Sequence, residues 1–233
     1  MGPDISQDEL PPVSVDPQSV RVQYQAWLDE VDDALTSAAL VVADAMSRVC
    51  RSPLEVDRGG LAEARRMAAD VRERCGHVEE QAFLLLAREA PVSGDLRRLV
   101  AILRLVGNVD RTARLTLHVA ESVDQLDLRA QPTRVRQQFE ELAARSTEVF
   151  GRGVDAWRQR DGLAVHELVR LDADVDTLRN GLLDHARDLG GSASDLLLVG
   201  LLARYLERLA DHGVVFAQHA TFVVTGERID VGA

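Results

Sequence analysis

The amino-acid sequence predicts an all-α fold made of two tandem three-helix bundles of long antiparallel helices. The 233 residues are 46% hydrophobic but only 4% aromatic, and this Ala/Leu/Arg-rich composition favours helices over strands. Apolar residues recur at steps of three and four in six segments. The second half of the chain also repeats features of the first, which indicates a duplicated unit.

The first half predicts three helices after a polar start. Residues 1–15 carry prolines and acids without periodicity and predict a disordered tail. Asp16 and Pro17 supply an N-cap and a first helical residue, and Ser52-Pro53 ends the first helix. The break at residues 91–94 separates the second helix from the third. The apolar positions are Leu28, Val31, Leu35, Ala38, Val42, Met46 and Val49 in the first helix, Leu61, Ala64, Met67, Val71, Cys75, Val78, Ala82 and Leu85 in the second, and Leu96, Leu99, Leu103, Val106, Ala113 and Leu117 in the third.

The second half predicts three more helices. Gln131-Pro132-Thr133 opens it, Gly190-Gly191 ends the fifth helix, and the sixth runs from about residue 192 to 224. The expected domains are therefore residues 16–128 and 129–226, followed by a short tail at 227–233. The apolar positions are Val135, Phe139, Leu142, Val149 and Trp157 in the fourth helix and Leu168, Leu171, Val175, Leu178 and Leu182 in the fifth.

Charge and composition exclude several functions. The net charge of -11 argues against nucleic acid as a partner, because phosphate contacts need clustered cations. The chain contains no lysine, which excludes a P-loop ATPase and a Schiff-base enzyme. Cys50 and Cys75 are expected to be reduced and partly buried thiols. No apolar run approaches the roughly 20 residues of a membrane span, and no signal peptide is recognisable, so a cytoplasmic protein is expected.

The repeat aligns acidic residues of the two halves. Arg58–Ala62 reads RGGLA and matches Arg160–Ala164, which reads RDGLA. In this register Asp70 corresponds to Asp172, and Arg74 corresponds to Asp176. In the third helix of each half, Asp110-Arg111 matches Glu207-Arg208, so that Arg114 corresponds to Asp211.

The second half therefore carries two acid pairs at i, i+4, and each pair lies on one helical face. The pairs are Asp172 with Asp176 and Glu207 with Asp211. Like charges on neighbouring helices repel unless a cation lies between them, and four carboxylates without a thiolate suit magnesium, manganese or iron. The alternative is that these acids are simply solvated on exposed helix faces.

In the first half, an arginine replaces the second acid of each pair. Asp70 is followed by Arg74 and Asp110 by Arg114, and such i, i+4 ion pairs stabilise a helix by roughly 0.3–0.5 kcal/mol. This half can neutralise its acids internally. A single metal site is therefore expected, in the second half.

Four segments together resemble the PhoU family of phosphate-uptake regulators. Residues 91–97 (PVSGDLR) resemble the family's P-x-A-x-D-L-R segment, and residues 205–212 (YLERLADH) resemble its L-E-R-I-x-D-H signature. Residues 171–176 resemble its D-x-x-[VI]-D element, and residues 224–227 resemble the segment that closes the last helix. The resemblance covers roughly residues 18–228.

The resemblance implies a function that the spacing alone does not. Family members are two side-by-side three-helix bundles that are not enzymes, and some bind iron or another metal cluster. They are negative regulators that link the ATPase subunit of the phosphate ABC transporter to a membrane sensor histidine kinase. The family's metal positions fall on Asp172, Asp176, Glu207 and Asp211 in the second half, and on Asp70 and Asp110 in the first half, where Arg74 and Arg114 argue against a cluster.

Other interpretations remain open. A helical adaptor that binds its partners without metal is one, and the oligomeric state could be monomer or homodimer. A ferritin-like metalloprotein needs Glu-x-x-His pairs, and none of the six histidines has a carboxylate three positions before it. No triad order is recognisable around the two thiols or His212, which argues against a hydrolase or transferase.

Asp95 is expected to be a first-turn charge of its helix, whereas Arg97 is either a similar charge or part of a contact surface. The aromatic residues expected to anchor the core or an interface are Tyr24, Trp27 and Trp157.

Overall fold

The computed structural model of the protein describes residues 17–51, 59–128, 130–187 and 192–229, and these contain six α-helices and no strand. The predicted all-α class and the two three-helix bundles are confirmed. The expected tail at 1–15, Asp16, Ser52-Pro53 and Gly190-Gly191 lie outside the described residues. The helices are α1 (Pro17–Arg51), α2 (Gly59–Glu89), α3 (Ser93–Gln125), α4 (Thr133–Gln159), α5 (Ala164–Arg187) and α6 (Ala193–Thr225).

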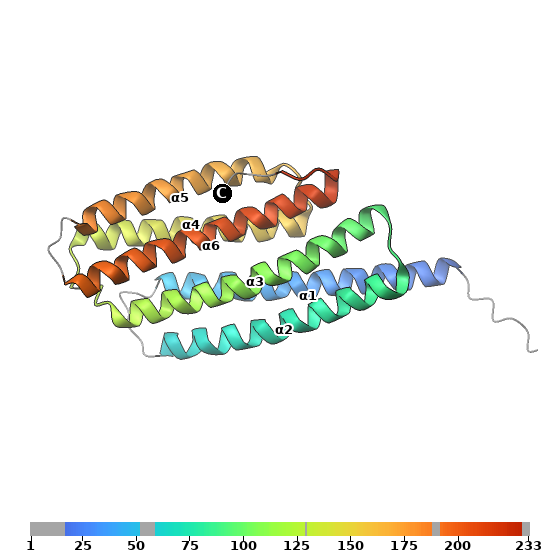
Figure 1. Ribbon diagram of the computed structural model, residues 1–233, viewed down its shortest axis with the longest axis horizontal. Helices are drawn as coiled ribbons and strands as arrows, with labels where there is room; N and C mark the ends of the chain where they lie inside the picture. The colour runs from blue at the N-terminus through green and yellow to red at the C-terminus, as the bar shows by residue number, and fades with distance from the viewer. Residues whose placement is uncertain (1–16, 52–58, 129, 188–191, 230–233) are drawn as a thin grey trace, which may run out of the picture.

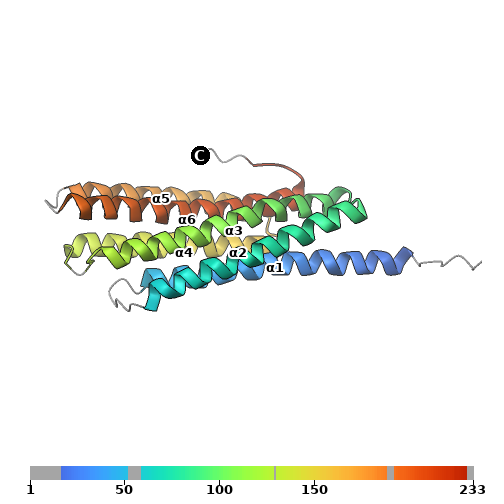
Figure 2. The ribbon, with the colours of Figure 1, turned by 60° about the horizontal axis from the view of Figure 1, so that its bottom comes forward.

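The six helices run nearly parallel to the long axis of the molecule, and consecutive helices reverse direction (Figure 1). α1, α2 and α3 form one bundle, and α4, α5 and α6 form the other. Within the described chain, the bundles meet where α3 packs on α6 and α1 packs on α4. Figure 2, turned by 60°, shows α3 and α6 still adjacent. None of the described helices combines the length and apolarity of a membrane span.

The core follows the predicted periodicity. Leu28, Leu35, Ile102 and Leu142 are fully buried, and such apolar burial is the main source of folding stability. The prediction that Leu96 is buried was wrong, because it is 41% exposed; Trp27 is 40% exposed, so that it is not a core anchor and its role as an interface anchor stays a prediction. Both lie near the ends of the first bundle's helices, where fewer neighbouring helices remain to cover them.

Two glycines allow α4 and α6 to approach closely. A Cβ on Gly153 would lie 2.0 Å from the carbonyl oxygen of Gly213, and one on Gly213 would lie 2.6 Å from the Cα of Phe150. Neither contact is sterically possible for a larger residue. Beside them, the rings of Phe150 and Phe216 meet edge to face at 5.9 Å. The glycines therefore fix the separation of these helices.

A buried carboxylate joins the two bundles. Asp32 on α1 is only 3% exposed. It accepts hydrogen bonds from Trp157 Nε1 on α4 at 2.7 Å, from Arg98 Nε on α3 at 2.5 Å, and from Arg160 just after α4. The Arg160 guanidinium also lies 4.3 Å from the centre of the Trp157 ring. Since buried charges are retained where they are paired, Asp32 is the polar centre of the contact between bundles.

The start of α3 contacts the end of α6. Asp95 lies in the first turn of α3, as expected, and accepts a hydrogen bond from Gln25 on α1 at 2.9 Å. Arg97 donates to the carbonyl oxygen of Val223 at 3.4 Å. The last carbonyls of a helix lack partners within it and favour a cation. Arg97 therefore makes a structural contact with the end of α6.

Candidate functional site

The structure brings the four acids of the second half together between α5 and α6. Asp172 and Asp176 come from α5, and Glu207 and Asp211 come from the facing stretch of α6. Burial raises the pKa of Asp172 to about 7, and the nearby charges of Asp211, Asp176 and Glu207 add to the effect. Four carboxyl groups therefore share one electrostatic environment.

Their burial differs. Glu207 is only 7% exposed, Asp172 is half-buried, and Asp176 and Asp211 are exposed. One oxygen of Asp172 and one of Glu207 are buried and have no hydrogen-bond partner within the described part of the chain. The alternative of four solvated acids is therefore wrong for Glu207. The face of α6 that carries Glu207 packs against α5.

Two arginines occupy the centre of this acid cluster. Arg179 on α5 donates through Nη1 to Glu207 Oε1 at 3.0 Å, and Arg204 on α6 donates to the same oxygen. Burial, followed by the charge of Asp211, raises the pKa of Glu207, while Arg204 and Arg179 oppose the rise. Partial burial of its carboxyl group likewise raises the pKa of Asp211, although the residue as a whole is exposed. The cluster is thus partly neutralised by the chain's own cations.

The four acids do not form a ready-made metal site within the described residues. Across residues 17–51, 59–128, 130–187 and 192–229, no group of three or more His, Cys, Asp or Glu side chains is placed to hold one. A hard cation needs several free carboxylate oxygens, whereas Glu207 gives one oxygen to both arginines. That Asp172, Asp176, Glu207 and Asp211 bind a metal stays a prediction.

The arginines correct the comparison of the two halves. The sequence suggested that only the first half neutralises its acids internally, and there the expected ion pairs are confirmed, with Arg74 Nε 2.8 Å from Asp70 Oδ2 and Arg114 bonded to Asp110. The second half does the same with different residues. A signal was present for Arg204, which precedes Glu207 by three residues, but not for Arg179, which pairs with Glu207 from another helix.

The first half has a hollow where the second half has an arginine. In the register of the repeat, Gly107 corresponds to Arg204. Next to Gly107 lies a hollow of about 300 Å³ between α2 and α3, lined also by Cys75, Glu79 and Asp110. Burial, together with the charges of Asp110 and Glu79, raises the pKa of Cys75 to about 11. The thiol is therefore protonated at neutral pH and is a poor metal ligand.

The remaining candidate side chains lack the features of catalytic groups. Cys50 and Cys75 are free and buried, as expected, and burial raises the pKa of Cys50 to about 12. His212 is half-buried rather than on the open surface. Burial and the charges of Arg111 and Arg208 lower its pKa to about 4, so the ring is neutral at physiological pH.

Comparison with known proteins identifies the family. The family model described as PhoU domain matches residues 35–123. Phosphate-specific transport system accessory protein PhoU homolog 1 of Mycobacterium leprae is 30% identical over an alignment of 213 residues, and the match covers 89% of this chain and 95% of that protein. The chain belongs to the PhoU family. PhoU homolog 2 of Mycobacterium tuberculosis is also 30% identical over an alignment of 215 residues, and the match covers 89% of this chain and 99% of that protein.

The fold is that of solved PhoU structures. The crystal structure of the phosphate transport system regulatory protein PhoU from Streptococcus pneumoniae superposes with a TM-score of 0.81 at 17% sequence identity. The match covers 89% of this chain and all of that one. Both bundles of the PhoU fold are therefore present here, and the resemblance seen in the sequence motifs is confirmed.

Proposed function

We propose that the protein is a regulatory accessory protein of phosphate-specific transport. In this role it is a negative regulator that couples the ATPase subunit of the phosphate ABC transporter to a sensor histidine kinase. When phosphate is plentiful, it holds the kinase inactive and restrains uptake. The observation that carries the proposal is the 30% identity to named phosphate-transport accessory proteins over 89% of the chain.

The proposed action is binding rather than catalysis, in the cytoplasm and at membrane complexes. Six long helices offer extended faces to partner helices, a common mode of protein recognition. The thiols Cys50 and Cys75 have raised pKa values and the imidazole of His212 has a lowered one, so none of them is poised as a nucleophile or base near neutral pH. The same surfaces could join two copies in a homodimer.

The arginines on Glu207 favour regulation without a resident metal. Arg179 and Arg204 already supply the positive charge that a metal would bring to the acid cluster. A second candidate is metal-assisted regulation, with iron, manganese or magnesium at Asp172, Asp176, Glu207 and Asp211. The two buried carboxylate oxygens without partners favour this candidate. Its site would require the arginines to move aside.

The regulatory role is tested by deleting the gene in its own host. In phosphate-rich medium we expect the transcripts of phosphate-starvation genes to rise, and we expect the intact gene to restore repression. Unchanged transcripts would overturn the role. Complementation with an Asp176→Ala, Asp211→Ala double variant separates the two candidates, because restored repression excludes a required metal at these acids.

The partners are tested by recovering the tagged protein from membranes of phosphate-rich and phosphate-poor cells. The transporter ATPase and the kinase are expected in the phosphate-rich sample. Their absence from both samples would contradict the coupling.

A further inference from the structure

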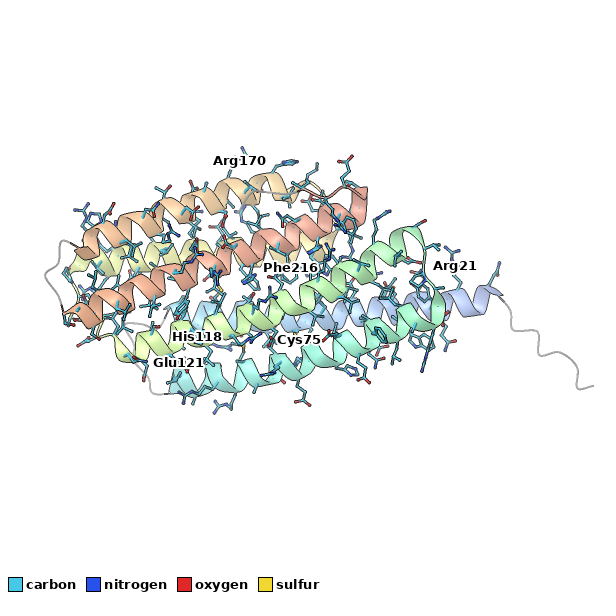
Figure 3. The ribbon with its side chains drawn as sticks, in the orientation of Figure 1. Arg21, Cys75, His118, Glu121, Arg170 and Phe216 are labelled. Atoms are coloured by element: carbon cyan, nitrogen blue, oxygen red, sulfur yellow. The ribbon has the colours of Figure 1, made fainter. Side chains whose placement is uncertain are left out.

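A row of arginines follows the contact between α3 and α6. On α3, Arg97, Arg104, Arg111 and His118 recur every seventh residue, so they stay on one side of the helix. The neighbouring side of α6 carries Arg208, and Arg228 follows that helix. We call Arg104, Arg111, Arg208 and Arg228 the α3–α6 seam. Figure 1 shows α3 and α6 lying along each other, and Figure 3 places His118 towards the far end of this row.

The seam arginines of α3, together with Arg208 and Arg228, act on two histidines of α6. These histidines are His212 and His219, and both imidazoles are half-buried. The charges of Arg111 and Arg208 reach His212, and those of Arg104 and Arg228 reach His219, where they help burial to lower the pKa of each ring to about 4. Both histidines are thus neutral, and the positive charge of the seam comes from arginine.

These arginines are available to a partner. All four are exposed, and in the described part of the chain Arg104, Arg111 and Arg208 form no ion pair. Arg228 lies over the Phe222 ring at 5.5 Å. Asp211 is the acid whose charge reaches Arg208, and it forms no ion pair with it. Without ion pairs, these arginines leave a positively charged strip on a protein of net charge -11.

We propose that the α3–α6 seam is the docking surface for an acidic helix of a protein partner. Arg104 and Arg111 are one heptad apart, which is about 10 Å along a helix. Glutamates at the same interval on a partner helix would meet both guanidinium groups, and arginine binds a carboxylate with two parallel hydrogen bonds. The inference rests on the proposed regulatory role, because it names the surface that one partner would use.

An anionic membrane is the less favoured occupant. Stable membrane binding combines basic residues with inserted apolar side chains. In the described residues, no large exposed apolar side chain lies between Val100 and Leu117 of α3 or between Arg204 and His219 of α6. The strong negative charge of the rest of the protein would also be repelled by an anionic surface. A partner helix covers only the seam and avoids this repulsion.

The test uses the purified full chain and a labelled helical peptide that carries glutamate at every seventh position. A second peptide with glutamine at those positions is the neutral reference. Fluorescence anisotropy measures both affinities at low and at high salt. We expect the glutamate peptide to bind more tightly and its affinity to fall with salt, because exposed charges are screened. No preference for the glutamate peptide would overturn the proposal.

Two triple variants make the test specific to the seam. Arg104→Gln, Arg111→Gln, Arg208→Gln is expected to weaken binding by at least about tenfold, since it removes three charge-assisted contacts. The matched control is Arg66→Gln, Arg134→Gln, Arg170→Gln, which changes net charge equally at exposed positions on α2, α4 and α5. Figure 3 shows Arg170 on the outer side of α5, away from α3. The control is expected to bind the glutamate peptide with an affinity within about twofold of that of the parent protein.

The remaining outcomes also decide the question. If both triple variants weaken binding of the glutamate peptide equally, the proposal of docking at the α3–α6 seam is overturned, because net charge alone then explains the loss. The protein could instead bind vesicles of phosphatidylcholine and phosphatidylglycerol through the seam and not bind the glutamate peptide. That result would overturn the protein partner and indicate a membrane as the occupant. Unchanged thermal unfolding of both variants shows that they fold. The peptide-binding test measures no response to phosphate. A negative result in it would therefore leave the regulatory role, which the transcript measurement tests, unaffected.

Discussion

Trp157 donates its indole N–H to Asp32 at 2.7 Å, across the boundary between the two bundles. Both side chains are almost completely buried, and the second oxygen of Asp32 accepts from Arg98 and Arg160. One carboxylate on α1 therefore orients groups from α3, from α4 and from the residue just after α4. Arg160 reaches it from a left-handed backbone conformation with φ of 55°, and burial lowers the pKa of its guanidinium. The contact between the bundles is thus polar and specific as well as apolar.

Replacing Trp157 with Phe should weaken this contact. The ring is largely kept, but the carboxylate of Asp32 loses a donor, and a hydrogen bond to a charged group is worth about 1.5–3 kcal/mol. We expect a loss of this size in the free energy of unfolding, measured by urea denaturation. Trp27→Phe is the matched control, because Trp27 is 40% exposed and should cost less than about 1 kcal/mol. Equal losses would show that the bond to Asp32 contributes nothing.

Gly213→Ala should destabilise the protein through the α4–α6 contact. The new Cβ would lie 2.6 Å from both the Cα of Phe150 and the carbonyl oxygen of Val149, and neither backbone atom can move without shifting a helix. Overpacking of this kind costs about 1–3 kcal/mol. The measurement is the thermal unfolding midpoint, for which about 1 kcal/mol corresponds to a fall of about 2–4 °C in a chain of this size.

Gly151→Ala is the control for this substitution. Gly151 lies in α4, and a Cβ there would meet nothing within 4 Å. Alanine is favoured over glycine inside a helix by about 0.5–1 kcal/mol, so this variant should be slightly more stable. Destabilisation of both variants to the same extent would contradict the role assigned to the close approach.

The fold could be predicted from the sequence because its determinants are local or periodic. Leu28, Leu35 and Leu142 fall on the predicted apolar faces and are fully buried. Leu96 follows the same periodicity yet remains exposed, since a three- or four-residue spacing identifies a helical face but not how far the next helix extends over it. The link from Asp32 to Trp157 joins residues far apart in the chain, and no local pattern could reveal it.

The sequence predicted the acids of the candidate site. It did not predict all of the arginines that neutralise them. The i, i+4 spacing placed Glu207 and Asp211 on one face, and the repeat located the matching Asp110 and Arg114. The pairing of Arg179 with Glu207 depends on how α5 and α6 are staggered, which the sequence does not reveal. The inference that the second half lacked internal neutralisation failed for this reason.

Asp172→Asn should stabilise the protein at neutral and alkaline pH. Burial and three nearby acids raise the pKa of Asp172 from 3.8 to about 7, so the folded state holds this proton more tightly than the unfolded state. Stability is therefore lost as pH rises between these values, and the full cost is present above about pH 7. Asparagine removes the charge, so the variant should unfold at a higher temperature than the parent at about pH 8, with the gain vanishing at about pH 4.

The control for this comparison is Asp174→Asn, at an exposed position on the same helix. It should change the unfolding temperature little at either pH, because exposed charges interact weakly. His212 and His219 titrate in the acidic range, but their effects cancel when variant and parent are compared at one pH. A gain for Asp172→Asn that did not change with pH would contradict the raised pKa.

Metal binding at the second-half acids should be limited by the arginines that bind Glu207. Arg179→Gln, Arg204→Gln removes two cations from a cluster of four acids and frees Glu207 Oε1. We expect this variant to be less stable than the parent without metal and to bind manganese at least about tenfold more tightly, as measured by calorimetry. Adding Asp176→Ala and Asp211→Ala should abolish the gain. If the parent already binds one equivalent of manganese as tightly as the arginine variant, the arginines do not compete with metal, and elemental analysis of the purified parent should then find that metal in place.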